Sequence, residues 1–333
     1  MYNYAEKQMT TATAHPNFAL IKYWGKSNES LNLPAAGSIS MTVEKLSTRT
    51  SVNFKSDLDR DIIWLNGSRV KGQELYRFTS FLNVIREVAN DSRHAEVMSS
   101  NNFPTAAGVA SSSSGFAALS LAASKAVGLS LSPQALSAVA RRGSGSAARS
   151  IFGGFVEMVA GNRADGGDSI AEPIAEAGFW PLNILIAITT VKAKTIGSTD
   201  GMNLTAETSP YYSAWIESTR NDLPQMKAAI LSRDFTRVGE LMEHSCLKMH
   251  GAMLSARPGL IYWNVGTLEV IAAVKELRKQ GHEAYFTIDA GPQVKILCQE
   301  QTKPAVLDTL SACSHVTEVI ATRPGPAAFL EED

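Results

Sequence analysis

The chain has 333 residues, 44% of them hydrophobic and 19% charged, a composition that is typical of a globular protein and excludes a disordered one. This length is enough for two packed domains rather than one small core. The 31 basic and 32 acidic side chains leave a formal net charge of −1, so the basic excess of nucleic-acid-binding proteins is missing. Any preference for anionic ligands must therefore come from a local site.

The three cysteines, Cys246, Cys298 and Cys313, are widely spaced and form no Cys-x-x-Cys pair. Zinc needs clustered ligands and a secreted disulfide framework usually has an even number of cysteines, so we interpret them as reduced thiols. Glu6 and Lys7 place charges where a signal peptide would have an apolar run, and no segment approaches the roughly 20 apolar residues that span a bilayer. We expect a cytoplasmic protein with neither a membrane nor a nucleic-acid partner.

Strand patterns and then helix patterns are found along the first half. Residues 49–54 alternate in part between apolar and polar side chains, and the apolar run 62–65 leads into Asn66-Gly67, a pair that favours a hairpin turn. Apolar side chains three and four residues apart predict a helix over residues 75–88.

Two further helices are expected over residues 112–127 and 133–142. Ser132 is a suitable N-cap, Pro133 suits the first helical position, and Gly143 is expected to end the second of these helices.

The second half alternates long helices with strands. Residues 182–191 form an apolar run typical of a buried strand, residues 265–280 predict the clearest helix, and residues 284–288 predict a strand that leads directly into Asp289. We place a domain boundary just before the first of these strands. The expected fold is α+β with two domains, 1–181 and 182–333.

Residues 101–115 form a loop of small side chains that opens into an Ala-rich helix. Small residues let backbone N–H groups approach a phosphate closely, and the helix N-terminus adds a favourable dipole. Ser111 and Ser112 could donate to phosphate oxygens, and one of them could help to hold Mg²⁺. The loop lacks the Gly-Lys-Ser/Thr of a Walker A motif. A buried, tightly packed Ala/Ser helix without a ligand explains the same residues equally well.

Residues 141–150 contain a second loop of this kind, in which residues 143–146 enter a short helix with Ser146 as the expected N-cap. Arg149 would then lie in the first turn, where a cation opposes the helix dipole unless an anionic ligand binds there. Arg141 and Arg142 are interpreted as a solvated helix C-terminus. Two phosphate-binding loops in one domain suggest a nucleotide and a second phosphorylated ligand, and hence phosphoryl transfer.

Lys22 stands in an otherwise apolar, strand-like run, where an unpaired charge is costly, so it needs a carboxylate partner or an anionic ligand. Asp289, between a strand and a Gly-Pro turn, is the best candidate for acid–base chemistry, although an Asx-turn explains it nearly as well. Asn17 could orient a substrate carboxylate or hydroxyl group. His244 and His250 share a helix face poorly, so we favour packing or solvation over metal binding.

Taken together, five segments of the chain resemble the GHMP kinase superfamily and, within it, the diphosphomevalonate decarboxylase family. The resemblance implies a two-domain α+β GHMP kinase fold, with an N-terminal domain similar to one of a ribosomal protein, a C-terminal α/β sandwich and the active site between them. It also implies ATP, Mg²⁺, 5-diphosphomevalonate as substrate, and a homodimer. The segments are residues 17–26, 101–115, 142–154, 196–202 and 286–292.

The resemblance also assigns roles to individual residues. Asp289 is expected beside the C3 hydroxyl group of the substrate, Lys22 beside Asp289, and Arg149 and Asn17 at the substrate carboxylate. The residues expected to hold the substrate diphosphate are Tyr23, Lys26, Ser144, Gly145, Ser146 and Ser198. Those expected at the ATP phosphates are Asn102, Pro104, Ala107, Gly108, Ala110, Ser111 and Ser112, with Ser112 chosen for the metal.

The chain departs from the common family pattern at two places. It has Ala35-Ala36-Gly37-Ser38 where many members have Asn-Ser-Ser, and Gln293 where Asn is usual. Both departures bear on substrate preference, and an enzyme acting on 5-phosphomevalonate or a kinase that only phosphorylates C3 stays open as an alternative. A silent metabolite sensor is a third alternative, against which the presence of Asp289 argues.

Overall fold

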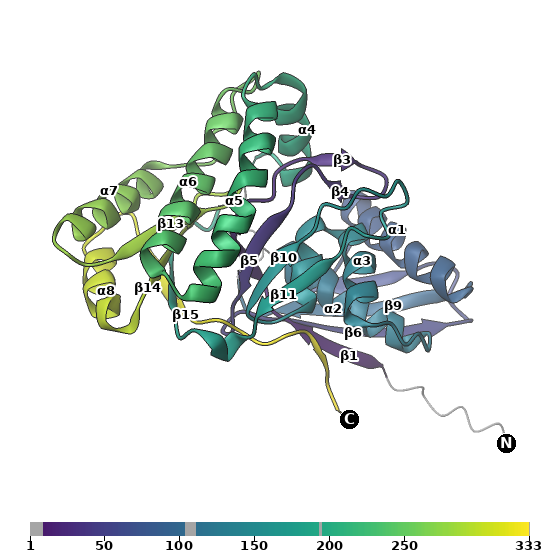
Figure 1. The fold of residues 1–333 in the computed structure, drawn as a ribbon. Coiled ribbons are helices and arrows are strands. Elements are labelled where there is room, and N and C mark those ends of the chain that lie inside the picture. Colours follow the sequence, from purple (N-terminus) through teal and green to yellow (C-terminus); the bar gives the residue numbers. More distant parts are fainter. Residues whose placement is uncertain (1–8, 104–110, 193–194, 333) are drawn as a thin grey trace.

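The structure is a computed structural model that describes residues 9–103, 111–192 and 195–332 (Figure 1). Three sheets and their helices make up most of it, with a small two-stranded ribbon, β3 (Lys26–Asn28) and β4 (Leu33–Pro34), beside them. Helices and strands are mixed in the manner expected of an α+β fold. In the described residues, no helix is long and apolar enough to cross a membrane.

The first sheet has six strands, and two helices pack their apolar faces on it. Within the residues that the structure describes, its strand pairs are antiparallel except for β7 and β9, which pair in parallel. Phe81, Leu82 and Ile85 of α1 (Gly72–Ala89) and the alanines of α2 (Ser111–Ala126) share one core with Val52 and Val97 of the sheet. The strand order is β16 (Phe329–Leu330), β1 (Thr10–Ala14), β6 (Thr48–Lys55), β9 (His94–Asn101), β7 (Ile62–Leu65) and β8 (Ser68–Arg69).

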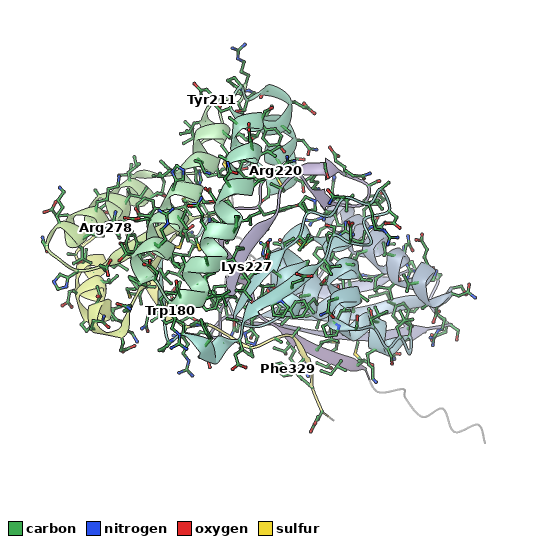
Figure 2. The ribbon with its side chains drawn as sticks, viewed as in Figure 1. Trp180, Tyr211, Arg220, Lys227, Arg278 and Phe329 are labelled. Carbon is green, nitrogen blue, oxygen red and sulfur yellow. The ribbon has the colours of Figure 1, made fainter. Side chains whose placement is uncertain are left out.

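The second sheet has four antiparallel strands and connects the two halves of the chain. Helices α5 (Tyr212–Ser232) and α6 (Phe235–Leu254) from the second half pack against its strands in a common core. Trp180 packs between Phe155 and Phe235, and Lys227 of α5 reaches Glu157 of β10 at 2.9 Å. Figure 2 labels Trp180 and Lys227. The strand order is β11 (Ala171–Ala175), β10 (Phe155–Met158), β5 (Ser38–Thr42) and β2 (Asn17–Ile21).

The third sheet is antiparallel and belongs to the second half of the chain. Its order is β13 (Ala284–Ile288), β14 (Val294–Cys298), β12 (Asn183–Ile188) and β15 (Glu318–Thr322), and α7 (Val265–Lys279) and α8 (Lys303–Ser311) share its core. Helix α4 (Ser198–Thr208) lies at the end of α5 and α6 (Figure 1). The remaining helical elements are α3 (Pro133–Gly143) and the 3₁₀ turns Gly145–Ile151, Ala177–Phe179 and Glu300–Thr302.

Most of the expected elements are confirmed, with small differences at their ends. The Asn66-Gly67 turn joins β7 to β8, and the Ser132 side chain accepts from the backbone of Ala135, as a helix N-cap should. The apolar run that begins at residue 182 is strand only to Ile188. The last strand, β16, returns to pair with β1, so the end of the chain adjoins the first sheet, and the domain division at residue 181 stays a prediction.

Candidate active site

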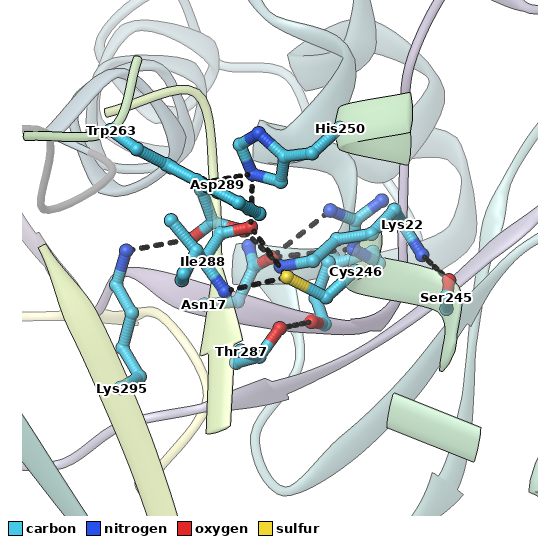
Figure 3. Close-up of polar contacts among 12 residues, drawn as sticks. Asn17, Lys22, Ser245, Cys246, His250, Trp263, Thr287, Ile288, Asp289 and Lys295 are labelled. Carbon is cyan, nitrogen blue, oxygen red and sulfur yellow. Dashed lines mark hydrogen bonds and ion pairs between the residues drawn. The ribbon is translucent and has the colours of Figure 1, made fainter. Parts of the chain in front are cut away.

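Asp289 lies at the centre of a buried cluster of charges where β2 and β13 end and β14 begins (Figure 3). One carboxylate oxygen, Oδ1, is 2.6 Å from Nζ of Lys22, which directly follows β2. The other, Oδ2, is 3.0 Å from Nζ of Lys295, the second residue of β14. The lysine side chains are 1% and 2% exposed, whereas that of Asp289 is 26% exposed. Asp289 therefore supplies the partner predicted for Lys22, and it keeps an accessible edge.

Burial and charge act on this carboxyl group in opposite directions. Burial alone raises the pKa of Asp289, but the charges and hydrogen bonds of Lys22 and Lys295 outweigh it and hold that pKa well below its ordinary value. Burial lowers the pKa of Lys295, and the charge of Asp289 opposes this shift. The pair of lysines thus keeps Asp289 ionised at neutral pH.

Arg149 is a third buried cation, close to the two lysines. Its guanidinium donates to the hydroxyl groups of Ser38 at 2.5 Å and Ser40 at 2.8 Å, and to Oδ1 of Asn17 at 3.2 and 3.3 Å. Asn17 is itself held, because its Nδ2 donates to Ser150 Oγ at 2.7 Å. These acceptors are neutral, and burial lowers the pKa of Arg149 to about 10. A buried guanidinium held only by neutral groups is well suited to an anionic ligand.

Two details of this region differ from the sequence predictions. The element that contains Arg149 is a 3₁₀ helix, Gly145–Ile151, with Ser144 as its N-cap, so Ser146 is not the cap and Arg149 lies in the last turn. The helix therefore begins before the expected position, and this earlier start moves Arg149 out of the first turn. Arg141 is not a solvated helix end: it is buried and donates to the backbone oxygens of Leu31 at 2.7 Å and Gly166 at 3.0 Å.

The two predicted phosphate-binding loops meet. The hydroxyl group of Ser144 donates to that of Ser112 at 3.4 Å and lies 3.3 Å from Ser146 Oγ. Ser112, in the first turn of α2, is exposed, while the alanines further along α2 are buried. The interpretation of this helix as packed core is therefore confirmed for its body, while phosphate binding at its N-terminus stays a prediction.

The remaining residues of the expected ATP loop are placed only in part. Asn102 uses its amide to bind the backbone, accepting from Ser47 N at 2.8 Å and donating to Lys45 O at 3.0 Å. Its contact with ATP stays a prediction. Pro104, Ala107, Gly108 and Ala110 lie outside the described residues.

The expected diphosphate site contains a buried hydroxyl group. Among the described residues, Tyr23 Oη has no hydrogen-bond partner, and a Cβ atom added to Gly145 would lie 2.3 Å from it. Lys26 is half-buried; burial lowers its pKa, while the charges of Glu29 and Asp200 oppose this shift. Asp200 belongs to the first turn of α4, and the half-buried Ser198 begins that helix; its contact with the diphosphate stays a prediction.

Two neighbours of Asp289 were not predicted to lie there: Lys295 was not singled out, and His250 was expected only to pack or to be solvated. Lys295 carries the same signal as Lys22, a lysine within an otherwise apolar strand, and this signal could have found it. His250 is buried, with Nε2 3.3 Å from Ile288 O and 3.3 Å from Trp263 Nε1. Burial and the charge of Lys22 lower the pKa of His250 to about 4, so its ring is neutral. In the part of the chain that the structure describes, no cluster of acidic, His or Cys side chains could hold a metal ion.

The two departures from the family pattern are well packed. Gln293 accepts from Thr189 N at 2.6 Å and donates to Thr190 O at 2.6 Å, which ties the turn after Asp289 to β12. A Cβ atom on Gly37 would lie 2.9 Å from the side chain of Leu223. Both residues therefore act on the packing around the site rather than in it.

Among the described residues, the cluster brings together three buried cations, Lys22, Lys295 and Arg149, and one carboxylate, Asp289. Such an excess of positive charge is stable in a protein interior only if anions bind there or the cations are well hydrogen-bonded. The accessible edge of Asp289 can accept a hydrogen bond from a hydroxyl group. The arrangement therefore suits a small ligand that carries both anionic groups and a hydroxyl group.

Comparison with known proteins identifies this combination of fold and site. Residues 14–171 match the model of the diphosphomevalonate decarboxylase-like N-terminal domain, and residues 184–326 match that of the mevalonate 5-diphosphate decarboxylase C-terminal domain. The human diphosphomevalonate decarboxylase is 37% identical over 312 residues, which cover 88% of this chain and 77% of that protein.

Solved structures of mevalonate diphosphate decarboxylases are similar to this chain over nearly its whole length. Mevalonate diphosphate decarboxylase from Staphylococcus aureus superposes with a TM-score of 0.93 at 39% identity, over 98% of both chains. A complex described as MDDEF with MVAPP, AMPPCP and magnesium superposes with a TM-score of 0.92 at 41% identity, over 98% of this chain and 99% of that one. The fold is therefore that of the GHMP kinases. More narrowly, the chain belongs to the diphosphomevalonate decarboxylase family.

Proposed function

We propose that this chain converts 5-diphosphomevalonate and ATP to isopentenyl diphosphate, CO₂, ADP and phosphate. The observation that carries the proposal is the buried cluster of Lys22, Lys295 and Arg149 around one ionised carboxylate, that of Asp289. It offers cations for the anionic groups of the substrate and one acceptor for its hydroxyl group. Family membership supports the same reaction.

Each part of the substrate has a proposed place. The carboxylate binds Arg149, which Asn17 holds in position, and the C3 hydroxyl group donates to the accessible edge of Asp289. The distal diphosphate lies against Tyr23, Lys26 and the loop of Ser144, Gly145 and Ser146, with Ser198 beside them. Two observations support this placement: the Tyr23 hydroxyl group has no partner among the described residues, and Gly145 approaches it so closely that a side chain there would clash with it.

The residues present also fit Mg-ATP. The exposed Ser112 at the N-terminus of α2 combines a hydroxyl group with the favourable dipole of a long helix, and it adjoins the proposed substrate loop through Ser144. Ser111 and Ser112 would therefore hold the ATP phosphates, with Ser112 also toward Mg²⁺. ATP supplies the phosphoryl group that turns the C3 hydroxyl group into a good leaving group.

The chain's own groups then have defined tasks. Asp289 would fix the hydroxyl oxygen in line for attack and take its proton as the bond from that oxygen to the γ-phosphorus forms and the bond from the γ-phosphorus to ADP breaks. A carboxylate with a lowered pKa is a weak base, so positioning contributes more than proton abstraction. The C3–O bond next breaks with the electron pair leaving on phosphate, and the bond to the carboxylate supplies the electrons of the new C=C bond as CO₂ departs. Arg149 orients that carboxylate until it is released.

The test is the formation of ADP and CO₂ with Mg-ATP and one of three substrates: 5-diphosphomevalonate, 5-phosphomevalonate or mevalonate. Equal amounts of ADP and CO₂ from the diphosphate alone are expected. ADP without CO₂ would make the chain a 3-kinase, and a preference for the monophosphate would make it the sister decarboxylase. The absence of turnover with all three would contradict the proposal and favour a sensor.

Two further proposals concern the state of the protein. We propose a homodimer, on the resemblance to its family, and light scattering during size exclusion should give twice the mass of one chain. We also propose a cytoplasmic location, which the reduced state of the three cysteines supports, because all three are free and buried. Fractionation of expressing cells tests this.

A further inference from the structure

We propose that Lys295 is a positioning residue for Asp289: the second lysine on its carboxylate holds the accessible edge of that carboxylate toward the substrate. This inference deepens the proposed function and rests on it. The role belongs to Lys295 rather than to a general basic environment, because each carboxylate oxygen has its own lysine.

The geometry excludes direct action of Lys295 on the substrate. Its side chain is 2% exposed and Nζ is 3.0 Å from Asp289 Oδ2, on the buried side of a carboxylate that is 26% exposed. Nζ also lies 5.0 Å from the centre of the ring of Phe18, which belongs to β2 of the second sheet. The lysine is thus fixed between β2 and the turn after β13, and it can reach the reaction only through Asp289.

The two lysines constrain Asp289 in a way that one lysine cannot. With Lys22 alone on Oδ1, the carboxylate can rotate about the bond to its Cβ atom and still keep its ion pair. A contact on each oxygen fixes both the plane and the direction of the accessible edge. A misplacement of about 1 Å of a group that aligns the substrate lowers turnover by roughly a hundredfold.

The charged and titratable groups that face Asp289 come from several elements packed around it. Lys22 follows β2, Lys295 lies on β14, Arg149 lies in the 3₁₀ turn, and Cys246 and His250 lie on α6. Burial raises the pKa of Cys246 and lowers that of His250, so both are neutral. Replacing Lys295 therefore removes one of the few full charges that act on this carboxylate.

The first experiment is a double-mutant cycle with Lys295→Met and Asp289→Asn, scored by kcat for CO₂ formation and by KM for both substrates. We expect Lys295→Met alone to lower kcat by about 10- to 100-fold, with each KM within about threefold of its original value. In the Asp289→Asn background the same change should alter turnover by less than about threefold, because its effect passes through the carboxylate. Lys295→Arg should recover most of the loss.

The matched control is Lys248→Met, which also removes a largely buried lysine paired with a carboxylate, that of Asp222, outside the site. It should leave kcat within about twofold. If Lys295→Met does not fold, Lys295→Gln takes its place. Unchanged kcat in the folded variant, or an equal loss in the Asp289→Asn background, would overturn the inference and leave Lys295 a purely structural residue.

A second readout does not need turnover. The ¹³C signal of the Asp289 carboxyl group, followed against pH, should show a pKa about one unit higher or more in Lys295→Met than in the original protein. An unchanged titration would overturn the inference even if the original protein proves inactive. If the original protein shows no turnover, the proposed function is contradicted instead. The failure of the inference and the failure of the proposed function can therefore be told apart.

Discussion

Asp289→Asn should destabilise the fold as well as stop turnover. The carboxylate of Asp289 is shared by Lys22 and Lys295, whose side chains are 1% and 2% exposed. Removing one partner of a buried ion pair costs about 3–5 kcal/mol, because the remaining charge is still buried. The amide oxygen of Asn can still accept from one lysine, so we expect a loss of about 3 kcal/mol. That is a large part of the roughly 5–15 kcal/mol that stabilises a typical domain.

Urea unfolding of the ligand-free protein at pH 7.5, followed by tryptophan fluorescence, measures this loss. The double variant Asp289→Asn with Lys295→Met should recover about half of it, or roughly 1–2 kcal/mol, because one buried cation is removed together with its counter-charge. The control is Asp222→Asn, which affects the less buried Lys248 and should cost about 1 kcal/mol. Nucleotide binding, measured by calorimetry, should survive in Asp289→Asn while turnover falls at least a thousandfold.

The pH dependence gives an independent check. The folded-state pKa of Asp289 is lowered, so its contribution to stability is present above the unfolded-state pKa and is lost as the pH falls through the acid range below it. Asp289→Asn should lack this part of the acid-induced loss. If the variant unfolded at the same urea concentration as the original protein, the lysines would not depend on Asp289. The assignment of an excess of buried charge would then be wrong.

Two further predictions concern the neighbours of this cluster. His250 has a pKa of about 4 in the folded chain and 6.5 when unfolded, so between these values the unfolded state binds more protons than the folded state. The free energy of unfolding should therefore fall by about 2 kcal/mol from pH 6.5 to pH 5. Urea unfolding at a series of pH values should show a weaker pH dependence for His250→Asn. Tyr23→Phe removes a buried hydroxyl group that has no partner among the described residues. The free energy of unfolding, measured by thermal unfolding, should therefore fall by less than about 0.5 kcal/mol or should rise. The KM of the same variant for the diphosphate substrate should rise about tenfold, and an unchanged KM would remove Tyr23 from the proposed site.

The sequence predicts best where one local pattern has one explanation. Ser132 and Pro133 correctly predicted the start of α3, and Asn66-Gly67 correctly predicted a hairpin turn, because caps and tight turns depend on a few adjacent residues. Lys22 was recognised as needing a partner because a lone charge in an apolar strand is costly. Asp289 was found as the first residue after a strand.

Predictions failed where the partner lies far away in the sequence. Arg141 looked like a solvated helix end, since nothing nearby reveals that carbonyl groups of Leu31 and Gly166 replace its water. Arg149 was linked to an anion because it was expected in a first helical turn, yet it lies in the last turn, and its burial among neutral groups is the better reason. The two-residue strand β16 is too short for any pattern, so its return to β1 could not be expected.

The proposed reaction has two steps, phosphoryl transfer to the C3 hydroxyl group and loss of phosphate from C3, and they need opposite charges near C3. This difference leads to a last prediction. Phosphoryl transfer alone is helped by cations, whereas the loss of phosphate from C3 develops positive charge that Lys22, Lys295 and Arg149 oppose. Asp289 supplies a negative charge from the protein at that point, and two lysines keep it ionised. The residual turnover of Asp289→Asn should therefore release more ADP than CO₂, with the 3-phosphorylated intermediate accumulating in quenched samples. Equal residual amounts of ADP and CO₂ would mean that Asp289 serves the alignment of the hydroxyl group alone.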